Sequence, residues 1–165
     1  MKLHNLYLMS GAPGSGKSTW IHNNVEEPYI ISRDAIRFMM INEKDDYFAK
    51  EKEVFKTFVR YIQESIDSDD TPEDIYVDAT HISKASRDKV LNALDLSHVK
   101  NVTVIVVRPS LAETLRRNEQ RTGRSRVPKS VVRRMWFQFE RPEDDEGRIY
   151  DVKYVEVPEE WEKFG

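Results

Sequence analysis

The sequence predicts an α/β domain in which helices cover both faces of a parallel sheet of about five strands. Short apolar segments rich in Val, Ile and Tyr alternate along the chain with longer amphipathic segments, and this alternation is typical of parallel sheets. The 165 residues fit one domain, which is expected to cover positions 1–165. A hydrophobic fraction of 39% provides a core and excludes a wholly disordered chain.

Five segments have the composition of strands. Leu3–Met9 mixes apolar and polar residues and runs into a cluster of Gly and Pro, which ends a strand. Tyr29–Ile31 and Ile75–Val77 are short apolar runs. Val102–Val107 consists entirely of β-branched residues and is the most strand-like segment of the chain. Val152–Val157 is expected to form the last strand.

Helices are expected between these strands. In 48–67 the apolar residues recur at spacings of one, three and four, which predicts an amphipathic helix. Ser83 is a suitable N-cap for a helix over 83–94. Shorter helices are expected over Lys17–Val25, Asp34–Ile41, Leu111–Gln120 and Lys129–Glu140. In the last of these, one apolar face is interpreted as core, and it comprises Val131, Val132, Met135, Trp136 and Phe139.

Composition excludes several classes of protein. The chain has no cysteine, which excludes a disulfide scaffold, a thiolate zinc site and a cysteine nucleophile. It has no apolar run of the roughly 20 residues that cross a bilayer, and its N-terminus does not have the form of a targeting segment. We therefore expect a cytoplasmic protein without a membrane partner.

The charges fall into two blocks, although the formal net charge is only −3. Between Arg108 and Arg134, nine cations stand against two carboxylates, which favours a surface for a polyanion. Between Glu140 and Gly165 the balance is reversed, with ten carboxylates against four cations. The sequence does not assign a role to this acidic C-terminal segment.

A phosphate-binding loop is the clearest motif. Gly-Ala-Pro-Gly-Ser-Gly-Lys-Ser at 11–18 matches G-x-x-x-x-G-K-[ST] at every fixed position, between a predicted strand and a predicted helix. Backbone N–H groups and the positive end of the helix dipole converge there on an anion. Lys17 is expected to reach the β- and γ-phosphates, and Ser18 to ligate Mg²⁺. The nucleotide-binding residues are predicted to be Gly11, Gly14, Ser15, Gly16, Lys17, Ser18 and Thr19.

Two carboxylates follow strands at the edge where an acceptor would bind. Asp34 follows the second predicted strand, and a carboxylate there can accept the proton of an attacking hydroxyl. Arg37, one turn further, can grip an acceptor phosphate. The alternative is that Asp34 merely caps a helix and that Arg37 is a surface residue. Asp78 ends the third strand and can hold Mg²⁺-bound water or orient Arg37.

The basic segment between the last two predicted helices, about 117–130, is expected to form a lid over the triphosphate. An arginine delivered to the transferred phosphoryl group contributes roughly 10³–10⁵ in rate where such arginines have been measured. Arg121, Arg124 and Arg126 are the alternatives for this position. A GTPase is disfavoured, because the guanine-reading tetrapeptide N-K-x-D does not occur.

Together these motifs resemble the 5′-hydroxyl polynucleotide kinase family, which includes the P-loop kinase domains of phage polynucleotide kinases and of eukaryotic polynucleotide kinase/phosphatases. The resemblance covers almost the whole chain. It runs through Gly11 to Trp20, Arg33-Asp34-x-x-Arg37, Asp78-Ala79-Thr80, Arg116 to Arg121, Val127-Pro128 and Phe139-Glu140-x-Pro142-x-x-x-Glu146-Gly147. In one departure, Ala79 stands where the phage pattern carries a hydroxyl residue.

The resemblance implies a role for individual residues. Asp34 would be the general base for the 5′-hydroxyl, and Arg37 would bind the next phosphate of the acceptor. Asp78 and Thr80 would lie on the acceptor side, with Asp78 also near the metal. Arg121 would be the lid arginine on the donor phosphates, while Arg124 and Arg126 remain alternatives. The last three implied contacts are Arg117 and Asn118 near the adenine and Val127 on the terminal base of the acceptor.

Three functions remain open on this basis. The leading hypothesis is an ATP- and Mg²⁺-dependent kinase that phosphorylates the 5′-hydroxyl end of DNA or RNA. A small-molecule or nucleoside kinase of similar fold is the second, since a chain of net charge −3 is unusual for a protein that clamps long nucleic acid. The third is an ATP-binding regulatory module, which Asp34 weighs against.

Overall fold

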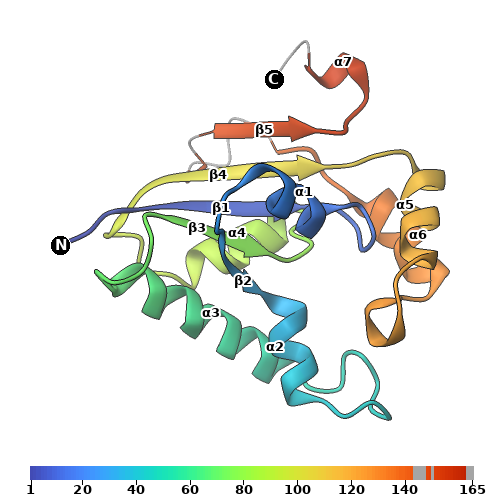
Figure 1. Cartoon of the computed structure of the whole chain (residues 1–165), viewed down its shortest axis with the longest axis horizontal. Helices are drawn as coiled ribbons and strands as arrows, with labels where there is room; N and C mark the ends of the chain where they lie inside the picture. The colour runs from blue at the N-terminus through green and yellow to red at the C-terminus, as the bar shows by residue number, and fades with distance from the viewer. Residues whose placement is uncertain (143–147, 150, 163–165) are drawn as a thin grey trace.

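The computed structural model describes residues 1–142, 148–149 and 151–162. Its centre is a five-stranded sheet in the order β2-β3-β1-β4-β5, and every described pair of neighbouring strands is parallel (Figure 1). The strands are β1 (His4–Ser10), β2 (Tyr29–Ser32), β3 (Asp74–Asp78), β4 (Val99–Val107) and β5 (Asp151–Val155). All five carboxyl ends therefore meet at one edge of the sheet.

The helices alternate with the strands along the chain and pack on both faces of the sheet. The described helices are α1 (Lys17–Asn24), α2 (Arg33–Met40), α3 (Glu51–Asp67), α4 (Lys84–Asn92), α5 (Leu111–Glu119), the short 3₁₀ helix η1 (Gly123–Ser125), α6 (Lys129–Gln138) and α7 (Glu159–Glu162). α5 and α6 gather at the carboxyl edge of the sheet, beyond the ends of β1 and β4 (Figure 1). None of the described helices is long and apolar enough to span a membrane.

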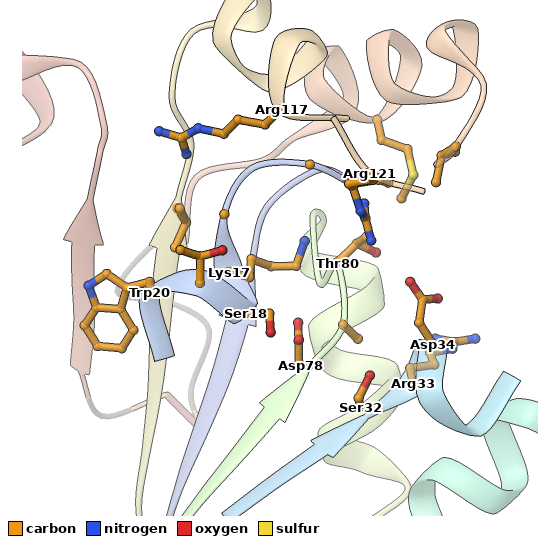
Figure 2. Close-up of a pocket in the computed structure, with 18 of the residues that line it drawn as sticks. Lys17, Ser18, Trp20, Ser32, Arg33, Asp34, Asp78, Thr80, Arg117 and Arg121 are labelled. Atoms are coloured by element: carbon orange, nitrogen blue, oxygen red, sulfur yellow. The ribbon is translucent and has the colours of Figure 1, made fainter. Parts of the chain in front are cut away.

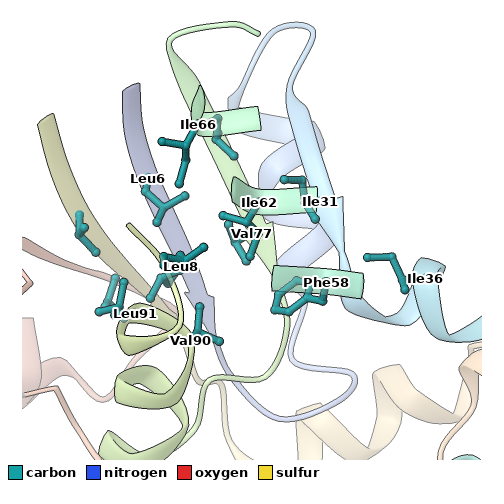
Figure 3. Packing of buried hydrophobic residues seen from close by; sticks show 14 of the residues in the cluster. Leu6, Leu8, Ile31, Ile36, Phe58, Ile62, Ile66, Val77, Val90 and Leu91 are labelled. Carbon is teal, nitrogen blue, oxygen red and sulfur yellow. The ribbon is translucent and has the colours of Figure 1, made fainter. Parts of the chain in front are cut away.

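The main core lies between the sheet and the helices α3 and α4. Leu6 and Leu8 of β1 are fully buried against Phe58 and Ile62 of α3 and Leu91 of α4 (Figure 3). A smaller cluster on the other face includes Ile21 of α1. Parallel strands buried on both faces explain why β4 lacks a polar alternation over residues 104–107.

The predicted fold class is confirmed, and the element boundaries differ only locally. Ser83 caps α4 in a capping box with Ser86, as predicted for this position. The helix expected from Phe48 begins only at Glu51, because Tyr47 and Phe48 pack edge-to-face outside it. The last two positions of the family-like motif, Glu146 and Gly147, lie outside the described residues.

Candidate active site

A cavity of about 850 Å³ lies at the carboxyl edge of the sheet. This volume is within the range of pockets that hold small molecules and nucleotides. The loop 11–16, the start of α2, the end of β3 and the lid segment all contribute to its wall (Figure 2). Most of the predicted site residues line it, namely Gly14, Gly16, Lys17, Ser18, Thr19, Asp34, Arg37, Asp78, Thr80, Arg117, Arg121 and Val127.

The phosphate-binding loop connects β1 to α1 with a backbone that only glycine adopts easily. Gly16, the N-cap of α1, has φ +103°, and a Cβ there would stand 2.7 Å from Nη1 of Arg117. Gly14 has φ +85°. Lys17 donates from Nζ to the carbonyl oxygens of Gly11 at 2.9 Å and Ala12 at 3.1 Å. Gly11 and Ser15 are buried within the loop, so they shape it and do not line the cavity.

Charges of opposite sign face each other across the floor of the cavity. Burial lowers the pKa of Lys17 and raises the pKa of Asp78, while the two groups favour each other's charged forms. Arg121 opposes the charge on Lys17 and supports that on Asp78. Ionisable groups perturbed in this way are frequent at functional sites.

The start of α2 places Asp34 in the wall of the same cavity, where its charge acts on both Lys17 and Asp78. Ser32 is the N-cap of α2 and accepts a hydrogen bond from the N–H of Ala35 at 3.1 Å, so Asp34 is not needed as a cap. Arg37 and the hydroxyl of Tyr47 both donate to Oδ1 of Asp34, the latter at 2.5 Å. Among the described residues no group donates to Oδ2, which leaves that oxygen as an acceptor.

Arg37 is held by protein groups. Only 4% of it is exposed, and Nη2 donates to both carboxylate oxygens of Glu51, at 2.8 and 2.9 Å. Burial works against its charge, but Tyr47, Glu51 and Asp34 together raise the pKa of Arg37. Arg37 was expected to bind an acceptor phosphate. In this structure its guanidinium instead forms a salt bridge with Glu51 of α3. Asp78 has no hydrogen bond to Arg37 in the described part of the chain.

The three alternative lid arginines occupy different places. Arg121 points into the cavity, and no hydrogen bond or ion pair holds its guanidinium among the described residues (Figure 2). Arg124 stacks 4.7 Å above the ring of Phe38 and donates to the carbonyl oxygens of Ile41 and Phe38 at the end of α2. Arg126 donates to the carbonyl oxygen of Arg121 at 2.9 Å. Arg121 is therefore the lid arginine that faces the phosphate loop.

Asn118 braces the lid from within. It is fully buried, and its amide donates to the carbonyl oxygen of Val127 at 2.7 Å and accepts from the N–H of Val127 at 3.1 Å. The amide of Asn118 is thus engaged by the backbone of Val127, and a position near an adenine stays a prediction for this residue. Arg117 instead reaches the loop, where Nη1 donates to the carbonyl oxygen of Ser15 and to Glu156, both at 2.7 Å.

The sequence did not predict the role of five residues that line this cavity or hold its residues. Tyr47 and Glu51 lie more than ten positions from Asp34, and no spacing rule connects them to it. Glu156 follows β5, which ends at Val155 and not at Val157 as predicted; a carboxylate just past a strand end was the available signal. Val131 and Met135 of α6, interpreted as core, line the cavity instead, whereas Val132 is buried as predicted.

The residues present fit a nucleoside triphosphate and Mg²⁺. The loop 11–18 offers a cradle that a Cβ at Gly16 would obstruct, and the buried Lys17 lies at its base. The hydroxyl of Ser18 and the carboxylate of Asp78 line the same cavity. Oxygen ligands of this kind suit Mg²⁺, which takes its remaining ligands from phosphates and water.

Several solved structures are similar to the chain. A chain of the Pnkp1/Rnl/Hen1 RNA repair complex is 21% identical at a TM-score of 0.66, over 84% of this chain but 44% of its own length. A gluconokinase from Sinorhizobium meliloti 1021 is 20% identical at a TM-score of 0.55, and the match covers 96% of this chain and 86% of the gluconokinase chain. Kti12 of Chaetomium thermophilum, in complex with ADP-AlF3, is 14% identical at a TM-score of 0.60, and the match covers 91% of this chain and 88% of the Kti12 chain.

These similarities concern the fold. The chain spans less than half the length of the RNA repair chain that it matches. No curated protein sequence matches the chain. The AAA_33 model, described as an AAA domain, matches residues 6–142, which include the phosphate loop, Asp34, Asp78 and the lid. The chain thus belongs to the AAA_33 family and is a P-loop kinase-type domain.

Proposed function

We propose that this protein transfers the γ-phosphate of ATP, with Mg²⁺, to the 5′-hydroxyl end of a nucleic acid. One observation carries the proposal: Asp34, whose Oδ2 accepts no hydrogen bond from the described residues, lines the same cavity as the phosphate loop. In this proposal an acceptor hydroxyl binds between them and attacks the outermost phosphate in line. A module that only binds ATP has no need of a carboxylate held in this way.

The chemistry follows from these positions. The acceptor oxygen forms a bond to the γ-phosphorus, the bond from that phosphorus to the bridging oxygen of ADP breaks, and Asp34 takes the hydroxyl proton on Oδ2. Tyr47 and Arg37 hold Oδ1 and so fix the orientation of the carboxylate. Lys17 and Arg121 carry positive charge toward the transferred group. Ser18, with Asp78 in the same cavity, would hold Mg²⁺, which would neutralise charge on the phosphates.

A phosphorylated small molecule or sugar is the second candidate product. The arrangement around Arg37 favours it, because a guanidinium already occupied by Glu51 is poorly available to the internucleotide phosphate of a strand. Sugar kinases also match most of this chain in fold. The two candidates differ in the acceptor and share Asp34 as the base.

The test is an acceptor panel with γ-labelled ATP. The panel contains a 5′-hydroxyl oligonucleotide, the same oligonucleotide with a 5′-phosphate, a nucleoside, gluconate and no acceptor. Label on the 5′-hydroxyl oligonucleotide alone, absent with the Lys17→Ala variant, is the expected result. Label on gluconate or the nucleoside alone would support the second candidate, and no transfer to any acceptor would contradict both.

A further inference from the structure

The outer face of α6 carries cations that no other group neutralises in the part of the chain that the structure describes. Lys129, Arg133 and Arg134 are exposed and take part in no ion pair or hydrogen bond there. Phe137, on the same helix, is 70% exposed, although a large aromatic side chain usually finds cover. We call these four residues the α6 stripe.

Helix geometry makes the stripe continuous. At 100° per residue, Lys129, Arg133 and Phe137 follow one another along one side of α6, and Phe137 lies between Arg133 and Arg134 around the axis. Val131 and Met135 occupy another side and line the cavity. The same helix thus contributes to the wall of the active site and presents a basic, aromatic surface to solvent.

Apart from Arg121, which points into the cavity, the other cations of the basic segment have partners among the described residues, and for Arg126 the partner is the carbonyl oxygen of Arg121. Arg108 stacks 3.7 Å from the ring of Trp136, and Arg116 and Arg117 pair with Glu113, whose pKa they lower to about 2. Arg124 binds the end of α2. Among the described residues, the exposed cations of this segment that have no partner are therefore those of the α6 stripe, next to the cavity, in a chain whose net charge is −3.

We infer that the α6 stripe binds a single-stranded nucleic acid on the 3′ side of the acceptor terminus, with its cations on phosphates and Phe137 on a base. This inference rests on the proposed function and names the part of the substrate that extends beyond the reacting nucleotide. Repeated phosphates match the charge of the stripe, and an unpaired base offers Phe137 a flat face to stack on. An acidic peptide would match the charge but not the aromatic group.

The experiment measures binding without catalysis. A single-stranded oligonucleotide of about twelve nucleotides, labelled at its 3′ end, is titrated with the full chain and followed by fluorescence anisotropy over a range of salt concentrations. Arg133→Gln/Arg134→Gln is expected to make the slope of log K against log salt shallower by about 1.4. Phe137→Ala is expected to weaken binding of this oligonucleotide about fivefold or more. The same variant is expected to bind an abasic strand of equal length as tightly as the wild type does.

A matched control removes the same charge from a distant helix. Lys56→Gln/Arg60→Gln on the exposed side of α3 is expected to leave both affinity and salt slope unchanged. Wild-type affinity and slope in the α6 variants, an equal change in the α3 control, or equally tight binding of polyglutamate through the α6 stripe would each overturn the inference.

A kinetic arm separates this inference from the proposed function. With a nucleoside 3′-phosphate as acceptor, the α6 variants are expected to keep the wild-type KM, whereas their KM for the oligonucleotide rises. If all variants phosphorylate the oligonucleotide with equal KM, the inference about the α6 stripe is refuted and the proposed kinase function stands. Binding through the α6 stripe without phosphorylation of any 5′-hydroxyl end would refute the proposed acceptor.

Discussion

The two halves of the cavity are built in different ways. The donor half is one continuous segment, the loop 11–16 and the first residues of α1, whose shape depends on glycine backbone angles and on contacts within the segment. The acceptor half is assembled from side chains of three segments, with Asp34 from α2, Tyr47 from the segment after it and Glu51 from α3. A change in the acceptor half should therefore impair chemistry while the binding of ATP persists.

The largest expected effect comes from Asp34→Asn. The amide cannot accept the hydroxyl proton, so we expect kcat to fall by about 10² to 10⁴. The Kd for ATP is expected to stay within about twofold of wild type, because the donor loop is untouched. Isothermal titration with a non-hydrolysable ATP analogue and steady-state kinetics measure the two quantities. The control is Asp88→Asn, which makes the same change at an exposed carboxylate on α4.

Loss of ATP binding in Asp34→Asn would contradict the separation of the two halves. It would mean that the carboxylate supports the structure of the cavity as a whole rather than the reaction.

The next largest expected effect is the pH dependence of protein stability that comes from His81, which packs against the end of β1 below the phosphate loop. His81 is buried, its Nδ1 lies 2.7 Å from the carbonyl oxygen of Met9, and burial lowers its pKa from 6.5 to about 4. The unfolded chain takes up this proton near pH 6.5, whereas the folded protein resists it until about pH 4. The free energy of unfolding should thus fall by about 3 kcal/mol as pH falls through that interval.

The variant His81→Asn isolates this contribution. Asn tolerates the positive φ of 40° at this position and does not titrate, so its free energy of unfolding should lose about 3 kcal/mol less than wild type between about pH 7 and about pH 4. Urea unfolding at several pH values gives both curves. Parallel curves for the two proteins would exclude His81 as the titrating group.

Tyr47→Phe examines the acceptor half more finely. The variant keeps the ring contacts with Phe38 and Phe48 but loses the hydrogen bond to Asp34. A hydrogen bond to a charged group contributes about 1.5–3 kcal/mol, so we expect kcat to fall about tenfold or more with the KM for ATP unchanged. Tyr61→Phe, on the surface of α3, should have no effect on either constant. An unchanged kcat in Tyr47→Phe would mean that Arg37 alone orients Asp34.

The same contrast explains what the sequence could predict. The donor loop is encoded by eight consecutive residues, and the strand pattern gave the fold class and the edge where Asp34 and Asp78 meet. Tyr47 and Glu51 reach Asp34 and Arg37 through the packing of α3 on α2, and spacing along the chain contains no information about that contact. The motif predicts a ligand residue at Asn118, and it does not show that folding engages the amide with the backbone of Val127.

The smallest expected effect compares two helix caps. Ser32 caps α2, which carries Asp34, and Ser83 caps α4, which has no residue in the cavity. Replacing either serine by alanine is expected to cost about 1 kcal/mol of stability, because an N–H at the helix start loses its partner. Only Ser32→Ala should also lower kcat, by about two- to fivefold, since loosening the first turn of α2 displaces Asp34.

The control Ser32→Thr restores the cap and should recover both the stability and kcat. Thermal unfolding and kcat measured side by side decide the matter: an equal fall of kcat in Ser83→Ala would show that general destabilisation, and not the position of Asp34, lowers the rate.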